Sequence, residues 1–338
     1  MRTIEWDEGT VTIVDQTKLP DETFYLSMTK CDEVASAIQE MKVRGAPLIG
    51  VAAAYGLALT AYHSKAKTRA ALMRQMETSA KTLKGTRPTA VNLFWAIDRV
   101  LSKARGTIGS AKTVARVVVD EARGMADEDV EINRKIGANG SKLICDGDVL
   151  LTHCNAGSLA TVDYGTALGV IRTAWEAGRK IRVIATETRP RLQGARLTAY
   201  ELKRDGIPVT LITDNMVGYA MSQRLINKVV VGADRIVRDA VVNKIGTYTI
   251  AVLAHEHGIP FYVAAPTSTF DLAQASQDVV IEERSRDEVS YIGSERVTPA
   301  EVDVLNPAFD ITPMKYVSAI ICETGVLSPA EFLQAASA

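Results

Sequence analysis

Hydrophobic and polar residues change their spacing twice along the chain. The first 30 residues contain three short β-like runs separated by turn residues, which predicts a small antiparallel sheet. These runs lie at residues 3–6, 11–14 and 24–28. From Cys31 to about Ile136 the apolar residues recur with a helical period, as at Val34, Ile38 and Met41. This part of the chain is therefore predicted to be mostly helical.

After Gly137, short runs of β-branched residues alternate with longer helical stretches, which is typical of parallel β-α-β units. The strand-like runs lie at residues 149–153, 181–186, 209–213, 228–231 and 261–264, and the helical stretches at residues 165–177, 194–204, 216–225 and 247–257. We therefore predict an α/β fold with two domains. A small N-terminal antiparallel β plus helical domain (1–136) is followed by a Rossmann-like doubly wound parallel sheet (137–338).

Polar residues follow the C-terminal end of each predicted strand. Ligands of doubly wound sheets bind in the crevice at these strand ends, so the polar residues predict a site there. They lie at residues 154–157, 187–189, 214–215, 232–235 and 266–268. The chain has no G-x-G-x-x-G after its first parallel strand and no G-x-x-x-x-G-K-[ST], so the usual signals for a dinucleotide or a nucleoside triphosphate are absent.

Cys154 follows an apolar strand and precedes a loop in which free backbone N–H groups begin. This position favours a reactive thiol and the binding of an anion. The alternative is that Cys154 is a small hydrophobic residue that ends a buried strand. The other cysteines lack this context and are predicted to be structural; they are Cys31, Cys145 and Cys322.

Asp234 comes directly after a buried strand and two small residues, Gly232 and Ala233. Desolvation at such a position suits a carboxyl group to proton transfer. The alternatives are a helix N-cap or an ion pair with Arg235. Asp214 follows another predicted strand in the same way and is the second candidate carboxylate.

Arg44 and Arg87 each lie in a turn of small residues just before a predicted helix. A guanidinium beside the free N–H groups of a helix N-terminus can bind an anion, although a single arginine in such a turn is more often a solvated surface residue. A metal site is not predicted. His255 and His257 lack the H-E-x-x-H spacing, and His153 would point away from Cys154 along an extended strand.

The charge balance argues against a nucleic-acid or membrane partner. The chain has 39 basic and 40 acidic residues and a net charge of -1, so no global field attracts a polyanion. The longest strongly apolar stretch, at residues 47–62, is shorter than the roughly 20 residues of a membrane span and predicts a buried helix. Without a signal-peptide pattern or a C-x-x-C pair, we expect a cytoplasmic protein with reduced thiols.

Six motifs together resemble the methylthioribose-1-phosphate isomerases of the methionine salvage pathway. They are RGAPLIG (44–50), GTRPTAVNL (85–93), THCNAG (152–157), ETRPxxQGxRLT (187–198), GADRI (232–236) and NKIGT (243–247). The opening IEW (4–6) and the later NPAFD (306–310) are also similar to that family, so the resemblance extends over essentially the whole chain.

The resemblance implies that Asp234 is the proton donor and Cys154 the second catalytic group of an aldose–ketose isomerase. It also implies no cofactor, a sugar-phosphate substrate and a homodimer. The residues that it places around the substrate are Arg44, Gly45, Ala46, Arg87, Gln193, Asn243 and Lys244. Together with the two arginine turns, Lys244 predicts a clamp for one phosphate, leaving an apolar pocket for the substituent on C5.

The same superfamily contains two alternatives. Ribose-1,5-bisphosphate isomerase needs a second phosphate site, which Arg189 or Arg191 would have to supply. The regulatory subunits of the exchange factor for translation initiation represent a class without catalysis, against which the presence of both Cys154 and Asp234 argues. A 5-deoxyribose 1-phosphate substrate stays open, as does the choice between proton transfer through an enediol and hydride transfer.

Overall fold

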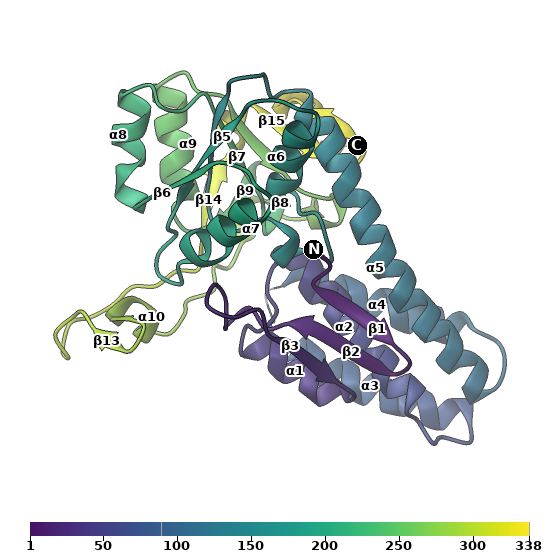
Figure 1. Ribbon diagram of the computed structural model, residues 1–338. Coiled ribbons are helices and arrows are strands. Elements are labelled where there is room, and N and C mark those ends of the chain that lie inside the picture. The colour runs from purple at the N-terminus through teal and green to yellow at the C-terminus, as the bar shows by residue number, and fades with distance from the viewer. Residues whose placement is uncertain (89, 338) are drawn as a thin grey trace. The chain divides into compact units, whose positions relative to one another are not determined.

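The structure is a computed structural model and describes residues 1–88 and 90–337 (Figure 1). The chain forms two compact units: Met1–Arg134 with Gly157–Gly165, and Lys135–Ala156 with Thr166–Ala338. The sequence pattern places one boundary after residue 136, a position that lies inside helix α5 (Ala111–Ser141). The segment Gly157–Gly165, just after the Cys154 loop, belongs to the first unit.

Helix α5 continues through the glycines at which the sequence pattern changes. A Cβ at Gly140 would lie 2.4 Å from a methyl carbon of Val170 in α6 (Ala167–Glu176). It would also lie 3.0 Å from a methyl carbon of Ile321 in β15 (Ala319–Cys322). Gly140 therefore allows close packing of the helix end, although glycine costs a helix interior about 1 kcal/mol.

The first unit contains the predicted antiparallel sheet, formed by β1 (Ile4–Asp7), β2 (Thr10–Val14) and β3 (Tyr25–Met28) in that order. Its helices are α1 (Cys31–Gln39), α2 (Ala46–Tyr62), α3 (Arg69–Lys84), α4 (Val91–Gly106) and most of α5. Helix α2 is buried along nearly its whole length, which explains its apolar composition. In the described part of the chain, no helix is long and apolar enough to cross a membrane.

Asp129 of α5 is a buried carboxyl group, and its Oδ2 accepts a hydrogen bond from the backbone N–H of Val162 at 2.7 Å. Burial raises the pKa of Asp129 from 3.8 to about 7. The folded state therefore binds this proton more tightly than the unfolded chain does. The stabilisation that results is present below about pH 4 and is lost as the pH rises towards 7.

We expect Asp129→Asn to flatten this pH dependence, because the amide cannot ionise and still offers an oxygen to Val162. Between pH 4 and 8 the wild-type protein should lose unfolding free energy relative to the variant, by on the order of 4 kcal/mol at most. Urea unfolding of both proteins across this range measures the difference. Parallel curves would show that Asp129 does not titrate in this window.

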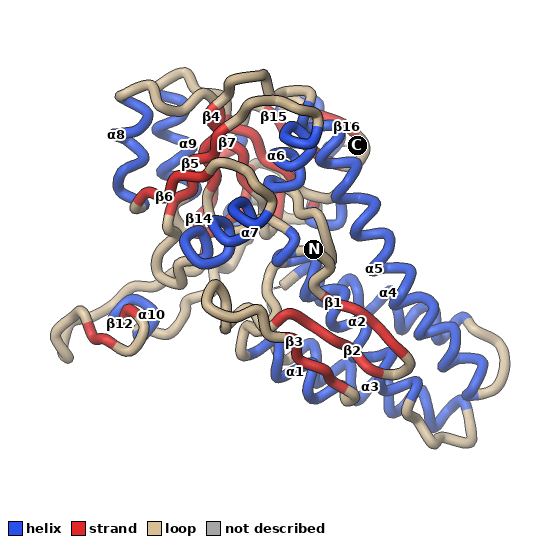
Figure 2. The backbone as a smooth tube through the Cα atoms, viewed as in Figure 1, coloured by secondary structure: helices blue, strands red, loops and turns tan. Residues whose placement is uncertain are grey.

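The second unit is built on a seven-stranded sheet, shown in red in Figure 2. Its order is β16 (Gly325–Leu327), β15, β10 (Phe261–Ala264), β7 (Lys228–Val231), β4 (Val149–Thr152), β5 (Arg182–Thr186) and β6 (Val209–Ile212). All neighbours pair in parallel except β15 and β16. In chain order the parallel strands read 3-2-1-4-5-6, which confirms the Rossmann-like doubly wound sheet.

Helices cover both faces of this sheet. On one face, α8 (Val217–Ser222) and α9 (Thr247–Glu256) share an apolar core with Leu151, Val229 and Val231. Leu150 and Val230 are buried on the opposite face because side chains alternate along a strand. Figure 1 shows α6 and α7 (Ala199–Arg204) on that side, away from α8 and α9.

Several short elements are not indicated by the sequence pattern. A four-stranded sheet has the order β11 (Phe270–Asp271), β8 (Arg235–Val237), β9 (Ala240–Lys244) and β14 (Phe309–Pro313). The remaining elements are α10 (Asp287–Ser290), β12 (Tyr291–Ile292), β13 (Glu295–Arg296) and α11 (Pro329–Ser337). Apart from the nine-residue α11, these elements are runs of two to five residues, which carry too little periodicity to be separated from loops.

Candidate functional site

The direction of strand order in the large sheet reverses between β4 and β7, which are neighbours paired at Leu150–Lys228 and Leu151–Val229. A crevice opens at such a reversal, outside the carboxyl ends of the strands. Cys154 follows the end of β4, and Asp234 follows the end of β7. The two predicted catalytic residues therefore border the same switch point.

The loops that carry these two residues are in close contact. A Cβ at Gly232 would lie 2.6 Å from the Cβ of Ala156, a separation that real side chains do not adopt. Only glycine at position 232 allows the loop of Asp234 to pack on the loop of Cys154. The absence of a side chain at position 232 therefore lets the loop that carries Asp234 contact the loop that carries Cys154.

Asp234 is half-buried, and its backbone N–H donates to the carbonyl oxygen of Val242 at 3.0 Å. It immediately precedes strand β8, so it is not a helix N-cap. The guanidinium of the next residue, Arg235, lies 3.7 Å from the Asp271 carboxylate and donates to Gln274 Oε1 at 3.1 Å. These contacts direct Arg235 towards β11 and the turn that follows it.

Cys154 lies beyond the end of β4 and has a φ of 62°, in the left-handed region that non-glycine residues rarely adopt. Its N–H donates to Thr188 Oγ1 at 2.9 Å, and its carbonyl oxygen accepts from Thr198 Oγ1 at 2.6 Å. The side chain is half-buried. Cys154 is therefore not a residue that ends a buried strand, because hydrogen bonds from two other segments hold its backbone outside the sheet.

His153 is buried and bonded on both ring nitrogens. Nε2 lies 2.9 Å from the carbonyl oxygen of Ile245, which can only accept, so Nε2 carries the proton. Nδ1 then accepts from Thr186 Oγ1 at 2.6 Å. Burial lowers the pKa of His153, and the ring stays neutral. His153 thus supports the loop and does not act as a base for Cys154, as the sequence analysis predicted.

Asp214 does not serve as a second acid. Its Oδ1 accepts the N–H of Thr188 at 2.7 Å, and its Oδ2 accepts the N–H of Arg189 at 2.6 Å. The sequence hypothesis of a second proton-transfer carboxylate is therefore replaced by a structural role. Asp214 holds the loop whose Thr188 hydroxyl supports the backbone of Cys154, and Thr188 itself has a φ of 63°.

Lys244, at the end of β9, is buried, and its Nζ lies 5.2 Å from the centroid of the Phe309 ring. Burial lowers the pKa of Lys244, while the electrostatic influence of Cys154 and Asp234 acts in the opposite direction. The ammonium group is thus electrostatically linked to both predicted catalytic residues. The preceding residue, Asn243, is buried and donates from Nδ2 to Thr247 Oγ1 at 3.0 Å.

Gln193 leads into a π-helical turn (Gly194–Thr198). A Cβ at Gly194 would lie 1.7 Å from the carbonyl oxygen of Thr186, so glycine is required for this turn to sit on the end of β5. The Oε1 of Gln193 is buried without a hydrogen-bond partner among the described residues. Such an orphaned acceptor is costly and suits a ligand that brings a hydroxyl group.

The predicted anion-binding arginines lie in the first unit. Arg44 is buried, and its Nε donates to Gln16 Oε1 at 3.1 Å. Gly45 has a φ of 94°, and a Cβ there would lie 2.5 Å from Ala160, so the turn before α2 needs glycine; Ala46 is the first residue of that helix. Arg87 is half-buried between α3 and α4. Thr89 of the same motif lies outside the described residues.

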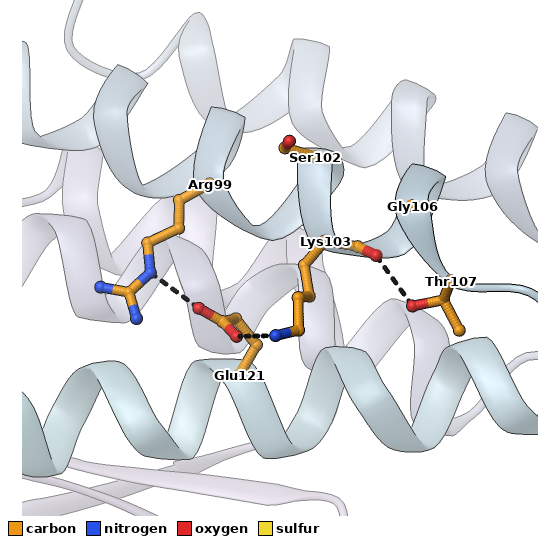
Figure 3. Close-up of a pocket in the computed structure, with 6 residues that line it drawn as sticks. All are labelled: Arg99, Ser102, Lys103, Gly106, Thr107 and Glu121. Atoms are coloured by element: carbon orange, nitrogen blue, oxygen red, sulfur yellow. Dashed lines mark hydrogen bonds and ion pairs between the residues drawn. The ribbon is translucent and has the colours of Figure 1, made fainter.

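A surface pocket in the first unit lies between α4 and α5 (Figure 3). It is lined by Arg99, Ser102, Lys103, Gly106, Thr107 and Glu121. The Glu121 carboxylate lies 2.7 Å from Arg99 and 3.5 Å from Lys103, so these charges satisfy one another. None of the predicted site residues lines this pocket. Across residues 1–88 and 90–337, no three His, Cys, Asp or Glu side chains gather as metal ligands.

The structure is thus an α/β protein with a Rossmann-like sheet, and Cys154 and Asp234 border the switch point at which sheets of this kind bind their ligands. The chain belongs to the Initiation factor 2 subunit family, whose model matches residues 42–329.

Relatives in this family carry two kinds of name. A methylthioribose-1-phosphate isomerase of Carboxydothermus hydrogenoformans is 53% identical over 97% of this chain and 96% of its own length. The structure of a 5-methylthioribose 1-phosphate isomerase of Pyrococcus horikoshii has 46% identity and a TM-score of 0.93, covering 99% of this chain and 95% of that one. A structure from A. fulgidus described as translation initiation factor eIF-2B, subunit delta, has 51% identity and a TM-score of 0.90, with complete coverage of both chains. The resemblance to the isomerases is thereby confirmed, as is the fold.

Proposed function

We propose that the protein is an aldose–ketose isomerase that converts 5-methylthioribose 1-phosphate into 5-methylthioribulose 1-phosphate, a step of methionine salvage. The observation that carries this proposal is the placement of Cys154 and Asp234 on touching loops at the switch point of the sheet. A regulatory subunit has no need of a paired acid and thiol. The isomerase names of the relatives agree with this function.

The chemistry of the substrate explains why two proton-transferring groups are needed. Phosphate on the anomeric oxygen prevents the ring from opening as a free sugar does. In the proposed reaction, Asp234 protonates the ring oxygen as its bond to C1 breaks. One hydrogen then moves from C2 to C1, and the C2 hydroxyl loses its proton as the ketone forms. The protein thus donates one proton to the ring oxygen and takes one back from the C2 hydroxyl.

Cys154 is the proposed second catalytic group. In hydride transfer it accepts the proton of the C2 hydroxyl, and in transfer through an enediol it moves the proton between the two carbons. The reaction changes no overall oxidation level, so neither route requires a cofactor. The positive charge of Lys244 stabilises negative charge on the thiol or on the substrate phosphate.

The proposed substrate contacts come from several motifs. Gln193 offers its orphaned oxygen to a sugar hydroxyl. Asn243 and Lys244 are the last residues of β9, the strand that pairs with β8 next to Asp234. Arg44, Gly45, Ala46 and Arg87 keep the substrate-binding role that the resemblance implies.

The direct test is to incubate the purified protein with 5-methylthioribose 1-phosphate and, separately, with 5-deoxyribose 1-phosphate, and to follow ketose formation by NMR. Running the reaction in deuterated water also distinguishes the two routes. An enediol admits solvent deuterium at C1, whereas hydride transfer does not. Absence of turnover with both sugars would contradict the isomerase and favour the regulatory alternative.

The proposed preference for an uncharged substituent on C5 of the sugar depends on the positions of Arg189 and Arg191. Arg189 Nη2 donates to the carbonyl oxygen of Val289 at 2.9 Å, and Arg191 Nη1 donates to Glu288 Oε1 at 2.8 Å. Glu288 also accepts two hydrogen bonds from Arg284. Both arginines are therefore engaged with residues 288–289, which supports the proposal that the site lacks a second phosphate position.

We expect the methylthio sugar to bind more tightly than ribose 1,5-bisphosphate, by about 100-fold or more. Burying a phosphate without a partner costs several kcal/mol, whereas a buried methylthio group contributes on the order of 1 to 2 kcal/mol. Dissociation constants measured by calorimetry test this order. Tighter binding of the bisphosphate would move the assignment to the bisphosphate isomerase.

We further propose that the protein acts in the cytoplasm as a homodimer, as the resemblance implies. Exposed apolar residues on β6, on α8 and in the loop after α8 support self-association; Leu211, Tyr219 and Leu225 are each about half-exposed or more. Light scattering at the concentration of the activity assay measures the mass directly. A mass near the 36.5 kDa of one chain would contradict the dimer.

A further inference from the structure

The backbone of Cys154 is connected to a buried ion pair that the proposed reaction does not use. Asn155, the next residue, donates from Nδ2 to Glu201 Oε1 at 2.8 Å. The other oxygen of Glu201 accepts from Arg172 Nη2 at 2.7 Å, and Arg172 Nε donates to Asp205 at 2.6 Å. Glu201 is 2% exposed and Arg172 7%.

The amide of Asn155 also connects to the carbonyl oxygen of Cys154, through the hydroxyl group of Thr198. Asn155 Nδ2 also lies 3.2 Å from Thr198 Oγ1, and Thr198 donates its own proton to the carbonyl oxygen of Cys154 at 2.6 Å. The π-helical turn ends at Thr198, and Glu201 lies in the helix that follows. Such turns often occur where a functional site needs a shifted side chain.

We propose that Glu201 is a positioning residue for the proposed isomerase: it holds Asn155, and through Thr198 it keeps Cys154 in the left-handed conformation beside Asp234. A left-handed residue with a side chain costs of order 1 to 3 kcal/mol and persists only where its surroundings hold it. Glu201 does this from one side, and Thr188 from the other.

Only a carboxylate satisfies both neighbours of Glu201. Arg172 and the Asn155 amide each present an N–H, so position 201 must offer two acceptors. Glutamine offers one acceptor and one donor, and either orientation of its amide places a donor against a donor. If Asn155 turns over to compensate, it withdraws its N–H from Thr198.

The principal test is Glu201→Gln, made with Cys145→Ser so that the exposed Cys145 does not react. We expect kcat to fall by about 10- to 100-fold with little change in KM, as is typical of a misplaced catalytic group. The rate at which iodoacetamide alkylates Cys154, measured by peptide mass spectrometry, should change by at least threefold. The matched control is Glu121→Gln, which removes the charge of a partly buried ion pair with Arg99 in the other unit. It should leave both kcat and the alkylation rate unchanged.

Two further variants separate positioning from stability. Replacing both Arg172 and Glu201 by leucine removes the buried charges together and should restore stability without restoring kcat. Thr198→Val removes the hydroxyl at nearly constant shape, and Thr198→Ser keeps it. We expect most of the turnover to survive only in the serine variant.

A purely structural role for Glu201 makes different predictions. In that case Glu201→Gln would lower the thermal stability. Its kcat per folded molecule and its alkylation rate at Cys154 would stay within threefold of those of the parent protein. That result would overturn the proposal. If Glu201→Gln does not fold, Thr198→Val with parent-like kcat overturns it. If the parent protein itself shows no turnover, the proposed function fails separately, and the alkylation rates alone decide the role of Glu201.

Discussion

Replacement of Asp234 by asparagine is expected to abolish isomerisation while leaving the fold and substrate binding nearly intact. The change keeps the shape of the side chain and removes only the transferable proton. Loss of a positioned acid typically costs about 10²-fold to 10⁴-fold in rate. Because the ring oxygen of a sugar 1-phosphate cannot leave C1 unaided, we expect the upper part of this range.

Steady-state turnover of Asp234→Asn, together with its affinity for the substrate by calorimetry, measures this effect. A suitable control is Asp271→Asn, which removes the carboxylate beside Arg235 and leaves Asp234 in place. The acid would have to be assigned elsewhere if Asp234→Asn retained most of its turnover with a normal KM.

Cys154→Ser is the second substitution for which we expect a collapse of activity, again of about 10²-fold to 10⁴-fold. A serine hydroxyl is of similar size but is a far weaker acid than a thiol, so it rarely forms the anion that accepts a proton. The backbone N–H and carbonyl oxygen of residue 154 should keep their hydrogen bonds to Thr188 and Thr198 in this variant. The variant therefore tests the sulfur atom and not the loop.

Substitution of the other thiols provides the comparison. Cys31 and Cys322 are buried, and burial raises the pKa of Cys31 to about 11, which keeps that thiol protonated and unreactive. Cys31→Ser and Cys322→Ser should remain active, measured as kcat per folded molecule. If serine at positions 31, 154 and 322 left the activity equally unchanged, Cys154 would have only a structural role.

The sequence allows the main sheet and its site to be predicted because the relevant signals are local. Buried parallel strands leave apolar runs, and the residues after each run lie at the carboxyl edge. This reasoning correctly places Cys154 and Asp234 at the end of neighbouring strands, β4 and β7. The catalytic roles themselves, and the phosphate clamp, stay predictions.

The supporting contacts could not be predicted in this way. Asn155 and Glu201 lie 46 positions apart, and the sequence does not distinguish Glu201 from the solvated glutamates of other helices. Cys154 adopts a left-handed φ although it is not a glycine, so its residue type does not indicate this backbone conformation. Asp214 occupies a strand end just as Asp234 does, and only the backbone N–H groups of Thr188 and Arg189 show that its carboxylate is already engaged.

The contact between Gly232 and Ala156 has an evolutionary consequence. Any mutation that adds a side chain at position 232 must push the two loops apart, because the Cβ atoms would meet at 2.6 Å. The strands beneath carry their own apolar core, so the scaffold can survive such a change. A lineage could thus lose catalysis in a single step and keep a stable protein free to acquire a binding role.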